Sequence, residues 1–440
     1  MTRFPERFGP FALLLLACVP LLGQAADPGP ISQRLREEWK FDPFYQKQVD
    51  VGVLVVGSKL VTNNALAEAA WIVERMLGTR PDIIKAMRAN KVCVAVMAAG
   101  EFTTDVPEHS QLRPKLYWDR RARGLGATLA NPVVSCGEEN LLGYPGDPYP
   151  KENIFVHEFA HAIHGTGLVK TDPMFDKNLR TAYQAARERG LWKNTYAATN
   201  HTEYWAEGVQ CWFDDNAPPD ALHNDIRTRA KLKEYDTELA KLCQEVFGDG
   251  DWRYTRPAAR KAEDRKHLVG YYLQKLTRFE WRVEPLHDKA KATVQTSLGD
   301  FDVDLDVKGS PEAVATFYKI ALNGGYHSGK FDRATHARDK PEIGYLSASV
   351  SLNWPDSAKH LKFPEIPAST IKPRDGALGL IRTGKNHGNL VVFLGDSQEP
   401  VPDIVLIGRI MKGMDVVRKM LTSEKDGTLA VDIRRVIRTE

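Results

Sequence analysis

The segment His157-Glu158-Phe159-Ala160-His161 constrains this chain more than any other feature of its sequence. Two histidines four residues apart lie on one face of a helix, because four residues turn the helix by about 400°. Their imidazole rings can then share one metal ion. Glu158, one step round the helix, can take a proton from a water molecule on that ion. The segment therefore predicts a zinc site with His157 and His161 as ligands and Glu158 as the general base.

A catalytic zinc ion needs a third protein ligand. Gly167 stands where the metzincins have a third histidine, which excludes that class of site. Glu203 and Glu207 lie four apart on one face of a second predicted helix. One of them can ligate zinc, and the other can accept the free ring N–H of a ligand histidine. His164 lies near the same face as His157 and stays open as a ligand, with a packing or substrate-contact role as the alternative.

The second predicted helix also carries a resemblance to a known family. The segment from Tyr196 to Glu207 (YAATNHTEYWAE) resembles the zinc-ligand segment of the anthrax lethal factor catalytic domain, and HEFAH matches that family's helix. This gluzincin-type resemblance implies that Glu203 is the third zinc ligand and that Glu207 supports a ligand histidine. It also implies that Tyr196 donates its hydroxyl to the developing oxyanion. The resemblance covers only about residues 150–215, so it implies metallopeptidase chemistry without indicating a substrate.

The first 26 residues predict an export signal. Arg3 and Arg7 supply a positive start, an apolar run follows, and small residues offer a cleavage site. The run ending at Cys18 (LLAC) resembles a bacterial lipoprotein box, which leaves a lipid anchor at Cys18 open. A secreted, periplasmic or cell-envelope location is expected. No later segment has the roughly 18 apolar residues that a transmembrane helix needs.

Composition is that of a globular chain of two or three domains. The 440 residues are 42% hydrophobic and 27% charged. The formal net charge is 60 − 57 = +3, too small to indicate a nucleic acid or an anionic membrane as partner. An even number of cysteines in an exported chain allows two disulfides, and buried thiols are the alternative. The cysteines that remain after Cys18 are Cys93, Cys136, Cys211 and Cys243.

The spacing of apolar residues predicts an α+β arrangement in the first part of the chain. The helix that carries HEFAH is expected to stop at Gly165 and Gly167. The stretch 99–149 is rich in turn residues. The predicted strands are 51–56 and 91–97, and the predicted helices are 33–40, 65–76, 152–164, 177–188, 203–213 and 219–246.

The sequence changes in character after a domain boundary placed near residue 288. Residues 291–307 alternate apolar and polar side chains around Leu298-Gly299-Asp300, which predicts a hairpin. Short β-like segments with turns fill most of the remainder. The further predicted elements are helices at 311–322 and 413–421 and a last strand at 429–437.

Residues 292–440 resemble the cyclophilin-type prolyl isomerases. The resemblance implies a closed antiparallel β-barrel with two helices. It makes Arg333 the catalytic arginine, whose hydrogen bond to the prolyl nitrogen weakens the resonance behind a rotation barrier of about 18–20 kcal/mol. The segments that carry it are Thr296-Ser297-Leu298-Gly299, Ser310–Val314 with Phe317, Gly325–Arg333, Gly376-Ala377-Leu378, Gly408-Arg409-Ile410 and Gly413–Val417.

The other active-site positions of that family are not matched. The family follows its arginine with a Gln-Gly-Gly segment, where this chain has Glu342-Ile343-Gly344-Tyr345. It has a Gln-Phe-Phe run where this chain has Leu390-Val391-Val392-Phe393, and its later histidine falls at about Ile404. A module that binds extended or proline-containing peptide would need the apolar pocket but not these residues.

The sequence thus predicts a signal peptide (1–26), an α+β zinc metallopeptidase-like domain (27–287) and an all-β cyclophilin-like barrel (288–440). The first hypothesis is an exported zinc metallopeptidase that acts on peptide or protein substrates through Glu158 and Tyr196. A domain that binds zinc without cleaving is the weaker form of this reading. The alternative is an extracytoplasmic prolyl isomerase or chaperone with a zinc-binding accessory domain.

Overall fold

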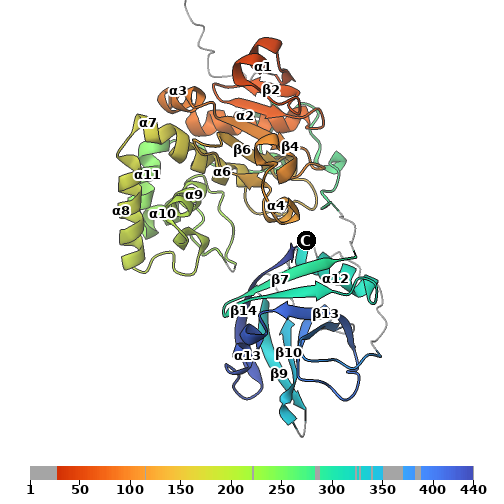
Figure 1. The fold of residues 1–440 in the computed structure, drawn as a ribbon. Coiled ribbons are helices and arrows are strands. Elements are labelled where there is room, and N and C mark those ends of the chain that lie inside the picture. The colour runs from red at the N-terminus through yellow and green to blue at the C-terminus, as the bar shows by residue number, and fades with distance from the viewer. Residues whose placement is uncertain are drawn as a thin grey trace, which may run out of the picture.

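The computed structural model describes most of the chain beyond the predicted export signal (Figure 1). The signal and Cys18 lie outside the described residues, so the export and lipidation predictions stay predictions. Among the described helices, none is long and apolar enough to span a membrane. The described residues are 27–113, 115–220, 222–282, 288–322, 325–326, 329–337, 340–349, 370–381 and 388–439.

A mixed sheet organises the first part of the chain. Its order is β1-β2-β3-β4-β6-β5, in which β3, β4 and β6 run parallel and the other described pairs are antiparallel. The central strands are buried throughout and mostly apolar, because helices and loops cover both faces of the sheet. The strands are β1 Gly29–Pro30, β2 Lys47–Asp50, β3 Leu54–Gly57, β4 Cys93–Met97, β5 Gly124–Leu125 and β6 Val133–Gly137.

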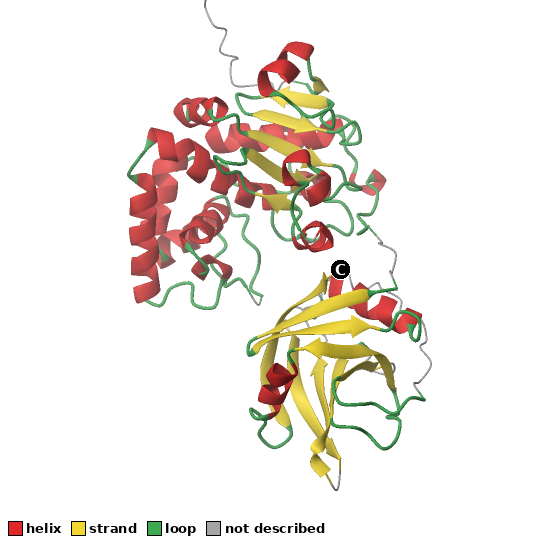
Figure 2. Cartoon of the chain, in the orientation of Figure 1, coloured by secondary structure: helices red, strands yellow, loops and turns green. Residues whose placement is uncertain are grey.

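The helices of this part flank the sheet and continue beyond it as a helical layer, as Figure 2 shows in red. Val55, Val94 and Val134 lie beside one another in the parallel strands and join the larger apolar core, which also takes in the helices. The helices are α1 Gln33–Trp39, α2 Asn63–Leu77, α3 Pro81–Ala89, α4 Lys115–Arg121, α5 Glu138–Leu142, α6 Ile154–Ala162, α7 Val169–Thr171, α8 Phe175–Glu188, α9 His201–Trp212, α10 Arg229–Tyr235 and α11 Thr237–Phe247.

Two predictions about these elements are wrong, and one central strand is not predicted. The helix with HEFAH does not stop at its glycines but continues as a π-helical turn, Ile163–Leu168, into α7. Gly167 serves close packing instead, since a Cβ there would lie 2.7 Å from Ile83 Cγ2 of α3. The predicted helix 219–246 is two helices divided at Asp236, whose side chain caps α11. The turn-rich stretch contains the central strand β6.

The C-terminal part is a closed antiparallel barrel in the order β10-β12-β11-β13-β8-β7-β14-β9. Figure 2 shows this part as mostly strand. The predicted barrel, its first hairpin and its two helices are confirmed. The elements are β7 Ala290–Thr296, β8 Gly299–Leu305, α12 Pro311–Leu322, β9 Gly329–Ala337, β10 Lys340–Ser349, β11 Ala377–Ile381, β12 Leu390–Leu394, β13 Ile404–Lys412, α13 Met414–Leu421 and β14 Thr428–Thr439.

The four cysteines within the described residues form no disulfide bonds. Cys93, Cys136, Cys211 and Cys243 are all buried free thiols. Burial raises the pKa of the Cys93 thiol, as it does for the others. Three of the side chains pack as small apolar groups, while Cys211 Sγ also donates to the Ile226 carbonyl at 3.0 Å.

Candidate metal centre

Two neighbouring helices position the candidate ligands. Helix α6 carries His157 and His161, and Asn153 caps it by accepting a hydrogen bond from the Phe155 amide. Helix α9 carries Glu203 in its first turn, and the Asn200 side chain accepts from the Glu203 amide at 2.9 Å. Apolar residues of α6 such as Phe155 and Phe159 are fully buried. Their packing fixes the position of the helix and so of the face that carries the ligands.

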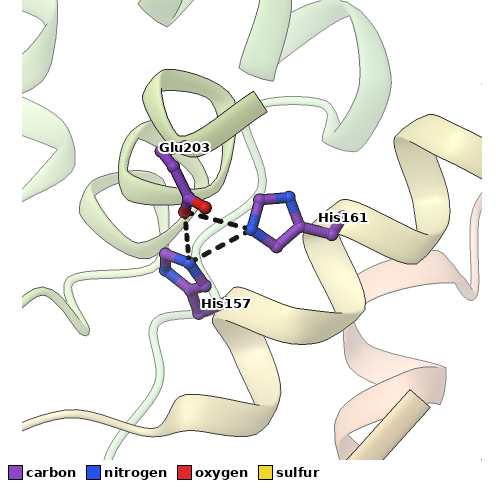
Figure 3. A group of neighbouring side chains, drawn as sticks. All are labelled: His157, His161 and Glu203. Carbon is purple, nitrogen blue, oxygen red and sulfur yellow. Dashed lines mark hydrogen bonds and ion pairs between the residues drawn. The ribbon is translucent and has the colours of Figure 1, made fainter. Parts of the chain in front are cut away.

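The three ligand atoms form a nearly equilateral triangle, which Figure 3 shows closing between the two helices. His157 Nε2 lies 3.1 Å from Glu203 Oε2 and 3.2 Å from His161 Nε2, and His161 Nε2 lies 3.2 Å from Glu203 Oε2. Tetrahedral ligands at zinc distances of 2.0–2.1 Å are separated by about 3.3 Å. Two imidazoles and a carboxylate are also a usual zinc donor set, so the residues fit that ion.

The electrostatics of the triangle favour positive charge. Burial lowers the pKa of His157, but the hydrogen bond to Glu203 and the charges of Glu158 and Glu207 outweigh burial and raise that pKa to about 10. Hydrogen bonds from the two histidines likewise hold the pKa of Glu203 well below its usual range, despite burial. A cation is therefore stabilised at this point, whether it is a proton or a metal ion.

Glu158 lies between the ligand histidines in sequence and faces β5, the last strand of the sheet. A Cβ built on Gly124 would be 2.9 Å from Glu158 Cγ, and one on Gly126 would be 3.4 Å from Glu158 Oε2. These two glycines thus let the chain pass directly against the reactive face of α6. Sequence reasoning missed them, although a pair of glycines flanking one residue is a signal for a close backbone approach.

Substitution of Gly126 should disturb the ligands. In a Gly126→Val protein the new Cβ would stand 2.7 Å from His161 Cβ, so that imidazole must move. We expect zinc affinity to fall about 10–100-fold, the range found when groups that orient a ligand are lost. Zinc titration against a competing chelator measures this. Gly29→Val in β1 of the same sheet is the control, since nothing lies within 4 Å of its Cβ. Equal affinities in the two variants would contradict the prediction.

Tyr196 is placed beside the triangle by a short 3-10 turn, Tyr196–Ala198, just ahead of α9. Its ring centroid is 6.2 Å from that of His157. Burial and the charge of Glu203 raise the pKa of Tyr196 to about 12, against a smaller lowering by Arg121. The phenol is therefore protonated at neutral pH and can act as a hydrogen-bond donor. Arg121, at the end of α4, is a neighbour of this site that sequence reasoning did not single out.

Glu207 is predicted to hydrogen-bond a ligand histidine, but the nearer partner of His157 is Gln210. His157 Nδ1 lies 2.8 Å from Gln210 Oε1 and 3.6 Å from Glu207 Oε1. Glu207 is engaged elsewhere, since it accepts from Asn216 Nδ2 at 3.0 Å and lies 3.7 Å from His223 Nε2. Gln210 lies about one turn further along α9, and its carbonyl oxygen is the nearer of the two acceptors to the ring.

His164 does not join the ligands. Its Nε2 lies 3.0 Å from Asp176 Oδ1 of α8, and His201 Nε2 lies 3.3 Å from the same oxygen. The group of three that comes together among the described residues is His157, His161 and Glu203. A packing role for His164 against α8 is what the structure shows.

The barrel places Arg333 on β9 with its side chain exposed. Arg333 is paired with Ser347 of β10, and Ser347 with Val391 of β12, so the three share the outer face of the barrel. Apolar side chains occupy this face further along: Phe393 and Ile404 are 2% and 4% exposed and belong to one cluster. The face therefore holds the arginine together with a cluster of apolar residues, at positions where the family resemblance implies polar ones.

A family model assigns the barrel. Residues 291–438 match the model described as "Cyclophilin type peptidyl-prolyl cis-trans isomerase/CLD". These residues form a cyclophilin-type domain. Two crystal structures of a Cryptosporidium parvum cyclophilin type peptidyl-prolyl cis-trans isomerase are similar to it, one of them determined in the presence of the dipeptide Ala-Pro. Their identities are 13% and 14% and their TM-scores 0.27 and 0.26. Each alignment covers 34% of this chain, and 98% and 99% of the respective structure. A search of curated proteins found no match.

Proposed function

We propose that the first part of the chain is a zinc-dependent peptide hydrolase. The observation that carries the proposal is the triangle of His157, His161 and Glu203, with side-chain separations of 3.1–3.2 Å and Glu158 on the same helix. The separations suit one tetrahedral ion, and Glu158, which directly follows His157 on α6, would supply the base for a water molecule on that ion. Residues 150–215 carry the resemblance to a metallopeptidase, which favours hydrolysis of a peptide bond without indicating which peptide.

The residues of the chain have distinct roles in such a reaction. Bound zinc would polarise the attacking water and the peptide carbonyl. Glu158 takes the proton that water loses as its oxygen bonds to the carbonyl carbon, and returns it to the amine as the peptide C–N bond breaks. Tyr196, protonated at neutral pH, donates a hydrogen bond to the oxyanion that develops. The products are a carboxylic acid and an amine, with one water consumed.

The edge of the sheet offers a way to hold an extended peptide. Strand β5 is the terminal strand, and among the described strands it pairs only with β6. Its glycine flanks lie against Glu158 and His161. A peptide that adds to the free edge of β5 would pass the reactive face of α6 with its backbone hydrogen-bonded.

The proposal is tested by digestion of a peptide library with zinc-loaded protein, read by mass spectrometry. Cleavage that stops on chelation and returns when zinc is restored is the expected result. A protein that holds one zinc ion per chain and cleaves no peptide would sink the proposal, and would leave a zinc-binding domain without hydrolase activity.

A second candidate function belongs to the cyclophilin-type domain, and the family match favours it. Arg333 is in the position of the family's arginine, but Ile404 and Val391 stand in the apolar cluster where polar or aromatic partners are expected. We propose that the domain binds peptide and has lost most of its isomerase site. The alternative keeps isomerase or chaperone activity in the barrel, with zinc bound by an accessory domain.

An isomerisation assay separates the two. With a proline-containing peptide we expect wild type and Arg333→Ala to give the same rate, close to the uncatalysed exchange of tens to hundreds of seconds at 25 °C. Arg374→Ala, at an exposed arginine 3.6 Å from Asp396, is the control for loss of a surface charge. Acceleration by wild type that Arg333→Ala alone removes would favour the isomerase function instead.

A further inference from the structure

Gln210 and Glu152 extend the candidate metal centre into the interior. Gln210 Oε1 lies 2.8 Å from His157 Nδ1, and Gln210 Nε2 donates to Glu152 Oε2 at 3.0 Å. Gln210 is completely buried. It follows Glu203 by seven residues, about two turns of α9, so both project toward α6 from one face. His157 is therefore held between Glu203 at one ring nitrogen and Gln210 at the other.

Each hydrogen bond in this series has a defined donor and acceptor. Gln210 Nε2 lies 3.0 Å from Glu152 Oε2, and because an amide nitrogen can only donate, the carboxyl oxygen of Glu152 accepts this hydrogen bond. The carbonyl oxygen of Gln210 then faces His157, and the nearest ring nitrogen, Nδ1, must carry a hydrogen to meet it. Nε2, the nitrogen that faces His161 and Glu203, is then the one that can offer its lone pair to a metal ion in place of a proton.

We propose that Glu152 and Gln210 are positioning residues that set the tautomer and the ring orientation of His157. The inference rests on the proposed zinc function and deepens it. Glu207 is a poorer partner for the ring, because its oxygen is 3.6 Å from Nδ1 and it is bound by Asn216. A neutral amide also orients the imidazole without adding a further negative charge against it.

The first test removes the acceptor. Gln210→Met keeps an unbranched side chain of similar length and loses both hydrogen bonds. We expect its zinc Kd, measured by competition with a fluorescent chelator, to rise about 10–100-fold. The hydrogen-bonded Nδ1 proton of His157, assigned with ¹⁵N-labelled histidine in the zinc-loaded protein, should lose its downfield signal. Gln244→Met, at an exposed glutamine of α11, is the matched control and should change neither quantity.

The second test exchanges the two side chains. Gln210→Glu alone sets two carboxylates against each other and should weaken zinc binding. Adding Glu152→Gln restores a donor opposite an acceptor, so the double variant should recover zinc affinity and the Nδ1 proton signal. Recovery of both shows that the pattern of donors and acceptors matters rather than packing alone.

The outcomes separate this inference from the function on which it rests. Wild-type protein that binds no zinc would overturn the proposed function. Wild-type protein that binds zinc, with Gln210→Met unchanged in Kd and in the Nδ1 signal, would overturn only the role of Gln210. A double variant no better than Gln210→Glu would overturn the direction assigned to the chain of hydrogen bonds.

Discussion

Replacement of Glu158 by glutamine should lower the rate of peptide hydrolysis by about 10²–10⁴-fold, the usual contribution of a positioned general base. Glutamine has nearly the same shape as glutamate, but its amide cannot take a proton from water. The zinc ligands are other residues, so the variant should still hold one zinc ion per chain. Both quantities come from the same preparation, by peptide digestion and by metal analysis.

The control for Glu158→Gln is Glu188→Gln, at an exposed position at the end of α8. That variant should cleave at the wild-type rate. If Glu158→Gln kept both its zinc and its full activity, the general base would be wrongly assigned and the observed cleavage would need another origin.

Replacement of Arg123 by methionine should destabilise the first part of the chain by about 3–5 kcal/mol. Arg123 donates to Glu139 Oε1 at 2.6 Å and to Oε2 at 2.9 Å, and neither side chain has any exposed surface. It also donates to the Glu101 carbonyl at 2.5 Å. Without the guanidinium, Glu139 is left as a buried carboxylate with no charged partner. Arg123 directly precedes β5, so this pair also anchors the strand beside the site.

Tryptophan fluorescence during urea denaturation measures this effect, because eight of the nine tryptophans precede residue 282 and report on that part of the chain. The control is Arg88→Met. Arg88 and Asp50 are also paired through two contacts, 2.8 and 3.0 Å, but with 37% and 40% of their side chains exposed. That pair should contribute no more than about 1 kcal/mol. Similar losses of stability in the two variants would contradict the importance given to burial.

The sequence predicts elements best where one physical signal dominates. The runs around Leu54–Gly57 and Cys93–Met97 are apolar throughout, and both are central parallel strands buried on two faces. Strand β6 has the same environment, but its apolar run is only Val133-Val134 within a turn-rich stretch. The length of the run, rather than its burial, decided which strands could be predicted.

Glycines and capping residues are positions where helix ends predicted from the sequence are wrong. Gly165 and Gly167 indicate a helix end by composition, yet neither adopts a positive φ, and Gly167 is packed against α3. Asp236 divides the predicted helix 219–246, because its side chain accepts from the Leu239 amide and starts α11. Trp192 Nε1 and the Tyr204 hydroxyl also donate to Asp236 Oδ2, at 2.8 and 2.7 Å. In both cases, therefore, tertiary neighbours that sequence spacing does not contain contribute to the outcome.

In the candidate site, too, the sequence predicts some residues and misses others. The ligands His157, His161 and Glu203 have side chains whose chemistry points to a metal, and the structure brings them within 3.2 Å of one another. Gln210 has no such signal, since a buried glutamine acquires its role only from the two groups it joins. Sequence spacing therefore proposes ligands, while the groups that orient them depend on the packing of α6 against α9.

The most direct measurement is the zinc content of the purified chain after loading and removal of free metal. We expect one zinc ion per chain in wild type, and a dissociation constant at least 100-fold higher in His161→Ala, which corresponds to about 2.7 kcal/mol of binding energy lost with the imidazole. His109→Ala, at a histidine buried away from the triangle, should keep its zinc. A wild-type chain that holds no zinc, or a His161→Ala chain that holds it as tightly, would contradict the metal centre.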